Sequence, residues 1–306
     1  MKKPIKKISL CMIVKNEEKI LFKSLNSVKN LVDEMIVVDT GSSDRTKEIA
    51  DSFGAKVFDF KWIDDFSAAR NYSISKSSGD WILILDADEY LIEDDFESIR
   101  KCINDNSKDV YCLKWQFLNE KKTGFKSFKV GLFRNKIGIR YQGLAHEEIL
   151  KGIDSSRWST IEATIFHEPA LDRQKDKEAY YYELVKRQLA LEPESAHWQI
   201  SCGIHSFMLG FSSIAKEHWI ETLKIKDRPI FWIYAAFYLA RFDYENNIND
   251  SIKYFEKLKE IYEDHKEDPS VIIHPEIKGI LDKFENIVYK KLDLDKDFQK
   301  FKDEVF

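Results

Sequence analysis

The sequence predicts an α/β fold, with a Rossmann-like, mostly parallel sheet covered by helices on both faces, followed by an α-helical domain. Over the first hundred residues, short apolar runs alternate with segments of helical spacing, as in chains that build parallel sheets. Polar clusters follow several of these runs, at the strand ends where such sheets bind ligands. Beyond Asp172 the periodicity becomes helical. We therefore expect two domains, residues 1–170 and 171–306.

The predicted elements of the first domain follow in chain order. Apolar runs typical of buried strands occupy Ile8–Val14, Met35–Val38, Ala55–Phe60 and Trp81–Leu85. Helical spacing occupies Glu17–Leu31, Ser43–Phe53 and Phe66–Ser77, with Ser43 as the expected N-cap of the second helix. From Asp109 to His167 the pattern is β-like and irregular: VYCLKWQF, FKSFKVGLF, IGIRYQG and ATIFHEP. These segments predict an additional, partly antiparallel edge of the sheet.

The second domain contains a weak internal repeat. The segments Leu189–Pro193 and Leu223–Asp227 lie 34 residues apart, and the pattern Ala215-x3-Trp219-x2-Thr222 returns 36 residues later as Ser251-x3-Phe255-x2-Leu258. A period near 34 with small and aromatic residues at these offsets indicates TPR-like helix pairs. An ordinary irregular helical domain accounts for the pattern equally well.

Composition restricts the classes of partner. The formal net charge is −5, and basic residues are interspersed with acidic ones, so we expect no nucleic-acid partner. The four cysteines show no CxxC pair and no zinc-ligand spacing, which favours reduced thiols in a cytoplasmic protein. The run Pro229–Ala240 is shorter than the ~20 residues that a membrane span needs, so no membrane span is expected.

Acidic residues follow the fourth predicted strand in the stretch WILILDADEY. Asp86 and Asp88 lie on the same side of an extended chain because side chains alternate. Two carboxylates in one crevice repel each other unless a cation lies beside them, and Mg²⁺ or Mn²⁺ bound in this way keeps positions open for phosphate oxygens. The alternative is an acidic cap on a following helix. We expect Glu89 to begin that helix.

Two further polar features accompany this pair of acids. Asp39 ends the second predicted strand and precedes a tight Thr-Gly-Ser-Ser-Asp turn, where its carboxylate could accept hydrogen bonds from a base or ribose. Arg70 lies one helical turn after Phe66, suitably placed to contact a nucleotide. The chain has no GxGxxG dinucleotide fingerprint.

Three segments in this order, SLCMIVKNEE, DEMIVVDTGSSDRTKEIA and DDFSAARNYSISKSSGDWILILDADEYL, resemble the nucleotide-binding half of family 2 glycosyltransferases with the GT-A fold. A weaker resemblance continues through YQGLAHEEI to FHEP. With its helical second half, the chain is similar to the bacterial branch with TPR-like extensions, which includes peptide S-glycosyltransferases of bacteriocins and flagellin-modifying enzymes.

The resemblance implies a UDP-sugar donor, a divalent Mg²⁺ or Mn²⁺ ion, and inversion at the anomeric carbon. Asp39 matches the base-binding Asp of the family, Arg70-Asn71 its Arg-Asn near the nucleotide, Asp86 the first D-x-D acid and Asp88 the metal ligand. The residues expected to contact the nucleotide-sugar are Val14, Asn16, Glu17, Asp39, Gly41, Arg70, Asp86 and Ala87. His167 is expected as an additional metal ligand, with a hydrogen-bonded structural histidine as the alternative.

Direct displacement also needs a base that removes the acceptor proton. The family supplies an Asp or Glu late in the domain, and here the candidates lie in Gly143–Glu148. Glu147 is the first candidate and His146 the second. The alternative for this His-Glu-Glu segment is the start of a surface helix.

We therefore expect an inverting, metal-dependent enzyme that moves a hexose or N-acetylhexosamine from a UDP-sugar to Ser, Thr or Cys of a peptide or protein. A glycan acceptor, lipid-linked or on a surface polysaccharide, is the alternative. A non-catalytic protein-binding module on a degenerate transferase fold is the alternative from another class. The helical domain is expected to shape the acceptor side or to form a homodimer.

Overall fold

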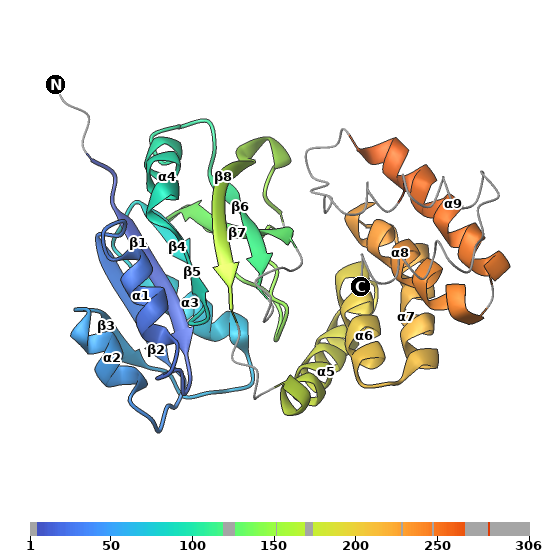
Figure 1. Cartoon of the computed structure of the whole chain (residues 1–306), viewed down its shortest axis with the longest axis horizontal. Coiled ribbons are helices and arrows are strands. Elements are labelled where there is room, and N and C mark those ends of the chain that lie inside the picture. Colours follow the sequence, from blue (N-terminus) through green and yellow to red (C-terminus); the bar gives the residue numbers. More distant parts are fainter. Residues whose placement is uncertain are drawn as a thin grey trace. The chain divides into compact units, whose positions relative to one another are not determined.

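The structure is a computed structural model that describes residues 5–118, 126–150, 152–168, 174–227, 229–246, 248–266 and 281. The chain divides into two compact units, residues 1–174 and 175–306 (Figure 1). The predicted boundary at residue 170 lies outside the described residues.

A single mixed sheet is the centre of the first unit. Its described strands are β1 (Ile8–Val14), β2 (Glu34–Asp39), β3 (Lys56–Asp59), β4 (Trp81–Ile84), β5 (Glu89–Tyr90), β6 (Val110–Phe117), β7 (Lys126–Arg134) and β8 (Trp158–His167), in the spatial order β3-β2-β1-β4-β7-β6-β8-β5. The first four strands are parallel. Strand β7 is antiparallel to both β4 and β6, and β5 is antiparallel to β8. The prediction of a parallel half with a partly antiparallel extension is confirmed.

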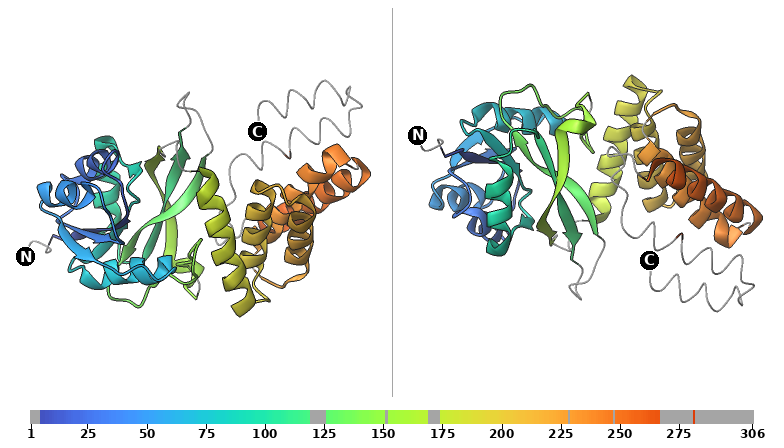
Figure 2. Two further views of the ribbon diagram at one scale, coloured as in Figure 1. Left: turned by 90° about the horizontal axis from the view of Figure 1, so that it is seen from below. Right: turned by 90° about the horizontal axis from the view of Figure 1, so that it is seen from above.

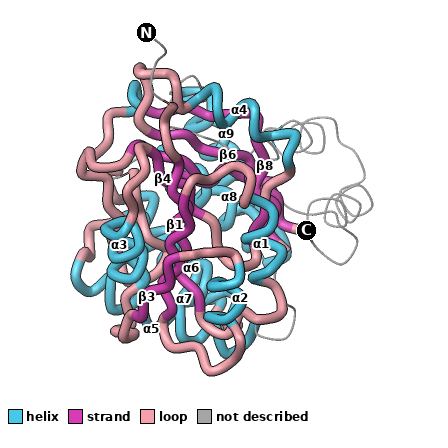
Figure 3. Tube along the Cα trace, turned by 90° about the vertical axis from the view of Figure 1, so that its left-hand side faces the viewer, coloured by secondary structure: helices cyan, strands magenta, loops and turns pink. Residues whose placement is uncertain are grey.

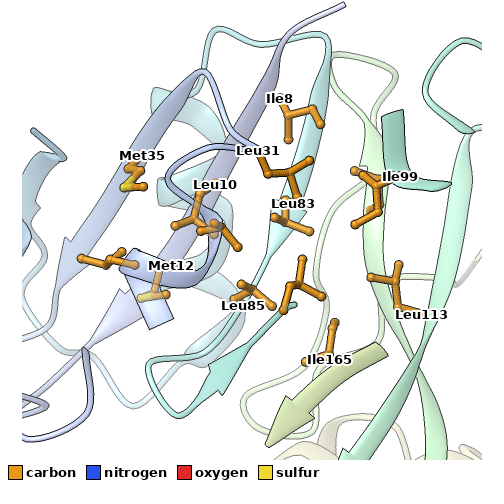
Figure 4. Close-up of a cluster of buried hydrophobic side chains, with 14 of the residues drawn as sticks. Ile8, Leu10, Met12, Leu31, Met35, Leu83, Leu85, Ile99, Leu113 and Ile165 are labelled. Carbon is orange, nitrogen blue, oxygen red and sulfur yellow. The ribbon is translucent and has the colours of Figure 1, made fainter. Parts of the chain in front are cut away.

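Helices cover both faces of the parallel half. The described α-helices of this unit are α1 (Leu21–Val28), α2 (Thr46–Ser52), α3 (Phe66–Lys76) and α4 (Phe96–Cys102). Figure 3 shows α3 on one side of strands β1, β3 and β4, with α1 and α2 on the other. Residues of α1 and α4 pack in the main core with Ile8, Leu10 and Met12 of β1 (Figure 4). Cys11 points to the opposite face, where its thiol donates to the Ser73 carbonyl of α3.

The core explains why these segments become strands. Leucine side chains that are completely buried, such as Leu10, Leu83 and Leu25, each stabilise the fold by about 1.5–3 kcal/mol. Strand β4 is buried at all four positions, because β1 and β7 flank it and side chains cover both of its faces. The residues that follow β4 therefore emerge from a rigid segment.

The second unit consists of consecutive helices: α5 (Gln174–Leu191), α6 (Ala196–Met208), α7 (Ser212–Lys224), α8 (Pro229–Asn246) and α9 (Ile248–His265) (Figure 2). Short links make neighbouring helices antiparallel, and α6–α7, α7–α8 and α8–α9 pack together. The repeated pattern of Ala215, Trp219 and Thr222 on α7 is buried, and so is its counterpart on α9 (Ser251, Phe255 and Leu258). The TPR-like prediction is confirmed, and the irregular alternative is wrong.

Two local predictions are wrong. Helix α2 begins at Thr46 without Ser43 as its N-cap, since the Ser43 amide donates to the Asn16 side chain and the Thr46 amide to Asp44. The segment 137–143 forms no regular strand, because Gly138 and Gly143 have positive φ values of 87° and 101° and turn the chain. Within the described part of the chain, no helix has the length and apolarity of a membrane span.

Candidate active site

The carboxyl ends of β1, β2 and β4 lie at one edge of the sheet, because these strands are parallel neighbours. The loops after β1 and β2 are joined there. The Val14 carbonyl accepts from both the amide and the hydroxyl of Thr40, at 2.9 and 3.1 Å. Asn16 adopts a left-handed φ of 55°, and the Glu17 amide donates to Thr46 Oγ1 at 2.7 Å. The predicted residues Val14, Asn16 and Glu17 thus form a framework with the loop of β2.

Asp39 combines a satisfied and an unsatisfied carboxylate oxygen. Its Oδ1 accepts from the amides of Gly41 and Ser42, both at 2.9 Å, which closes the turn after β2. Gly41 has a φ of 111°, a conformation that side chains disfavour. The side chain of Asp39 is 1% exposed, and its buried Oδ2 has no partner among the described residues. A buried acceptor without a partner is costly, and a ligand donor would satisfy it.

Asp86 lies between two cations. Arg70 of α3 contacts Asp86 Oδ1 at 2.9 Å, and Lys129 of β7 contacts Asp86 Oδ2 at 2.9 Å. Burial by itself raises the pKa of Asp86, but Arg70 and Lys129 outweigh burial and hold that pKa well below its usual range. Asp86 is therefore ionised throughout the neutral range, and both of its oxygens are engaged with cations.

Glu147 contacts the same arginine, Arg70, that contacts Asp86. The Arg70 Nε donates to Glu147 Oε1 at 2.7 Å, and the two side chains are 13% and 12% exposed. Although burial opposes the charged form, Asp86 and Glu147 raise the pKa of Arg70 above its usual value. Arg70 thus connects the acid after β4 with the first candidate base.

A compact loop presents Glu147. Gln142 and Glu148 form an antiparallel bridge, with backbone hydrogen bonds of 2.8 and 2.9 Å in the two directions. The segment is a turn, so the alternative of a surface helix start is wrong. His146, the second candidate base, has a φ of 52° and is exposed on this loop, whereas Glu147 points inward. The geometry favours Glu147 over His146.

Asp88 meets His167 because β5 pairs with β8. Their register places Glu89 opposite His167, and the Glu168 amide donates to the Asp88 carbonyl at 2.9 Å. As a result His167 Nε2 lies 3.1 Å from Asp88 Oδ2. The other ring nitrogen, Nδ1, is buried without a partner in the described structure, and the ring stacks on Trp115. Two potential ligands thus converge from residues 79 positions apart in the sequence.

A cavity of about 340 Å³ opens beside Asp88. Ala87, 6% exposed, lies on its wall, together with Tyr90 of β5 and Lys23 of α1. The Lys23 ammonium lies 3.7 Å above the Tyr90 ring and forms an ion pair with Glu168. The cavity therefore has an aromatic wall and charged groups of both signs.

The residues present fit a divalent cation. Within the described structure, Asp86, Glu89 and Glu147 form ion pairs with Arg70 and Lys129, and Asp88 contacts His167. Four carboxylates thus meet two permanently charged cations there, which leaves an excess of two negative charges. Carboxylate oxygen and imidazole nitrogen are suitable donors for Mn²⁺, and Mg²⁺ takes carboxylate oxygens. The described residues contain no group of three His, Cys, Asp or Glu that could hold a metal by themselves. Asp88 and His167 would therefore need ligand oxygens or water to complete the coordination.

The sequence analysis gave no role to Lys129 and a wrong role to Glu89, two residues that this cluster contains. Glu89 lies on β5 at 2% exposure and accepts from Trp115 Nε1 at 2.8 Å, so the expectation that it begins a helix is wrong. Lys129 donates to Glu89 at 2.7 Å, and nothing in its local sequence distinguishes it from the surrounding lysines. Asn71 uses both ends of its amide to hold the Tyr141 backbone, at 2.9 Å each.

Residues 9–158 match the family described as glycosyl transferase family 2. A TPR repeat-containing protein of Synechococcus elongatus is 44% identical over 140 residues, which are 46% of this chain and 34% of that protein. The SPbeta prophage-derived glycosyltransferase SunS of Bacillus subtilis is 30% identical over 198 residues, which are 62% of this chain and 47% of SunS. The matched region therefore spans between a third and a half of these relatives.

Among solved structures, S. aureus TarS residues 1–349 show a TM-score of 0.46 and 17% identity, covering 84% of this chain and 91% of that one. The family match covers the parallel sheet, its carboxyl edge and the Glu147 loop. The chain thus carries a family 2 glycosyltransferase domain at residues 9–158.

Proposed function

We propose that this chain transfers a hexose or N-acetylhexosamine from a UDP-sugar to an acceptor nucleophile, with inversion and with the help of Mg²⁺ or Mn²⁺. The observation that carries the proposal is the convergence, at one edge of a family 2 domain, of the Asp88–His167 pair and a Glu147 side chain held by Arg70. A donor-binding acid, a pair of metal ligands and a base are the groups that such a transfer requires.

The nucleotide part of the donor is proposed to lie at the loops after β1 and β2. There Asp39 Oδ2 is a buried acceptor in need of a donor. The imide N–H of uracil is a donor of that kind, and the rigid turn through Gly41 keeps the carboxylate in place. Because a wrong base would leave Asp39 Oδ2 unsatisfied, this contact favours a uridine nucleotide over one without an imide N–H.

Asp88 and His167 are the proposed metal ligands. When bound, the cation would neutralise charge on the diphosphate leaving group. Arg70 and Lys129 keep both oxygens of Asp86 engaged, so Asp86 is not among the proposed ligands, and its place on the nucleotide side rests on the resemblance to the family. The Trp115 ring holds the imidazole of His167 in position by stacking at a centroid distance of 4.9 Å.

Glu147 is the proposed base. Arg70 Nε occupies Glu147 Oε1, while Oε2 has no hydrogen-bond partner among the described residues. Oε2 can therefore accept the proton of the acceptor nucleophile, and Arg70 fixes the direction from which it does so. Because Arg70 also holds Asp86, the base and the donor side of the site keep a fixed separation.

The acceptor is proposed to be a Ser, Thr or Cys side chain of a peptide or protein. This choice rests on the resemblance to the branch with TPR-like helices and on the 30% identity to the glycosyltransferase SunS. A lipid-linked or polysaccharide acceptor would bind the same base. Mass spectrometry of products formed from peptide and glycan acceptors distinguishes the two.

The Glu147→Gln variant tests the mechanism. Glutamine retains an Oε1 that accepts from Arg70, so we expect the loop and UDP binding to persist while turnover falls about 10²- to 10⁴-fold. Turnover should also cease in EDTA and return with Mn²⁺. UDP-sugar hydrolysis and transfer are measured with UDP-Glc, UDP-Gal, UDP-GlcNAc and UDP-GalNAc. Normal turnover in Glu147→Gln would remove Glu147 from the role, and metal-independent turnover would overturn the metal-dependent mechanism.

A further inference from the structure

Lys129 contacts two acidic groups of the site, as many as Arg70 does, although the sequence gave it no role. Its Nζ lies 2.9 Å from Asp86 Oδ2 and 2.7 Å from each oxygen of Glu89, and its side chain is 25% exposed. Burial alone lowers the pKa of Lys129, but Asp86 and Glu89 raise it above the usual value. By contrast, the ion pair of Lys114 with Glu162, on β6 and β8, has side chains 45% and 84% exposed.

The segment between β4 and β5 depends on side chains for its shape. Residues 85–88 form no strand ladder, and their backbone is held at a few points. The Glu89 amide donates to the Asp86 carbonyl at 3.0 Å, and the Asp86 amide donates back to Glu89 Oε2 at 2.9 Å. Lys129 lies against both acids that close this turn, and Asp88 is inside it.

A β-bulge directs Lys129 to this turn. In the pairing of β6 with β7, Tyr111 lies opposite Leu132 and Cys112 opposite Val130, so Gly131 is the additional residue. After the bulge, Lys129 lies opposite Leu113 of the main core, and simple alternation from Leu132 would place it on the other face. A Cβ at position 131 would lie 3.0 Å from Ile165 Cδ1, which leaves little room for any larger residue.

We infer that Lys129 is a positioning residue of the proposed metal site: it holds Asp86 and Glu89 together so that the turn between them presents Asp88 to His167. This inference rests on the proposed function. Lys129 contacts neither Asp88 nor His167 in the described structure and acts on the metal through the backbone of the turn. Residues that orient metal ligands in this way typically change metal affinity 10- to 100-fold when they are replaced.

The test compares the wild-type chain with variants in two measurements. The first is Mn²⁺ affinity in the presence of UDP, from the electron paramagnetic resonance signal of free Mn²⁺, and the second is thermal melting of the full chain. Lys129→Met alone would leave Glu89 buried without its cation and could unfold the domain. The main variant is therefore Lys129→Met combined with Glu89→Gln. Because glutamine keeps one acceptor oxygen where Glu89 accepts from both Trp115 and the Asp86 amide, Glu89→Gln alone is measured beside it as the reference. Lys114→Met is the matched control on the neighbouring strand.

We expect the double variant to melt close to the wild type and to bind Mn²⁺ 10- to 100-fold more weakly, with Lys114→Met unchanged. The single variant Lys129→Arg, with Glu89 unchanged, should bind Mn²⁺ more tightly than the double variant does, because a guanidinium can donate to both acids. A folded double variant that binds Mn²⁺ within twofold of the wild type would overturn the role of Lys129 alone. A wild-type chain that binds no Mn²⁺ with UDP would overturn the proposed metal site, and the inference with it.

Discussion

Glu34 lies at the amino end of the parallel strands, at the edge opposite to the candidate active site. Its Oε1 accepts from the Ser9 hydroxyl at 2.5 Å and from the Gly79 amide at 3.1 Å, and Oε2 contacts Lys56 at 2.9 Å. One carboxylate therefore joins the beginnings of β1, β2 and β3 and the turn before β4. We predict that replacing Glu34 with glutamine removes a specific part of the stability of the first unit and leaves the active site intact.

The size of the effect follows from the pKa of Glu34. Burial alone raises this pKa, but hydrogen bonds from Ser9, Lys56 and Ser78 lower it from 4.5 to about 2. The side chain is 12% exposed, so solvent screens these contacts little. A shift of this size corresponds to about 3 kcal/mol at pH 7. Because the folded pKa is the lower one, this stability is fully present above pH 4.5 and is lost as the pH falls toward 2.

The assay is urea denaturation followed by far-UV circular dichroism, fitted with one transition for each unit. Between pH 7 and pH 3.5, the free energy of unfolding of the first unit should fall by about 1.4 kcal/mol more in the wild type than in Glu34→Gln. Glu162→Gln, at a side chain 84% exposed, is the control and should differ from the wild type by less than about 0.5 kcal/mol. Parallel pH profiles for the wild type and Glu34→Gln would refute the reasoning.

Two further predictions concern the Glu147 loop and the helical unit. Asn71→Ala removes both hydrogen bonds to the Tyr141 backbone, so turnover should fall about 10²-fold through displacement of Glu147 while UDP affinity, measured by calorimetry, stays within threefold. Gly203→Ala places a Cβ 2.3 Å from Nε1 of the buried Trp219, and should lower the free energy of unfolding of the second unit by about 1–3 kcal/mol without changing UDP affinity.

A specific result would contradict each of these two predictions. Unchanged turnover in Asn71→Ala would show that the loop holds Glu147 without the amide, through its own bridge between Gln142 and Glu148. An unchanged urea transition in Gly203→Ala would show that α6 and α7 can separate at this contact without loss.

The sequence indicated the parallel half of the sheet because strands buried on both faces consist of continuous apolar runs. Continuous apolar runs such as Ile8–Val14 can be covered on both faces only inside a helix-covered sheet, and the structure has β1 at these bounds. The positions of Asp39 and Asp88 followed from the same rule, since both come at the ends of such runs. The helical repeat was visible for a similar reason, because Trp219 on α7 and Phe255 on α9 stand at matching positions of the pattern and are both buried.

The sequence alone could not show which groups meet. Asp88 and His167 come together only through the pairing of β5 with β8, and Lys129 reaches Glu89 only because a bulge at Gly131 shifts the alternation of β7. Contacts between residues 40 or more positions apart leave no periodic trace in a single chain. The sequence by itself thus determined the parallel half of the sheet, the edge where polar residues gather and the residue types there, whereas the tertiary structure decided which acid is neutralised by cations and which one faces the histidine.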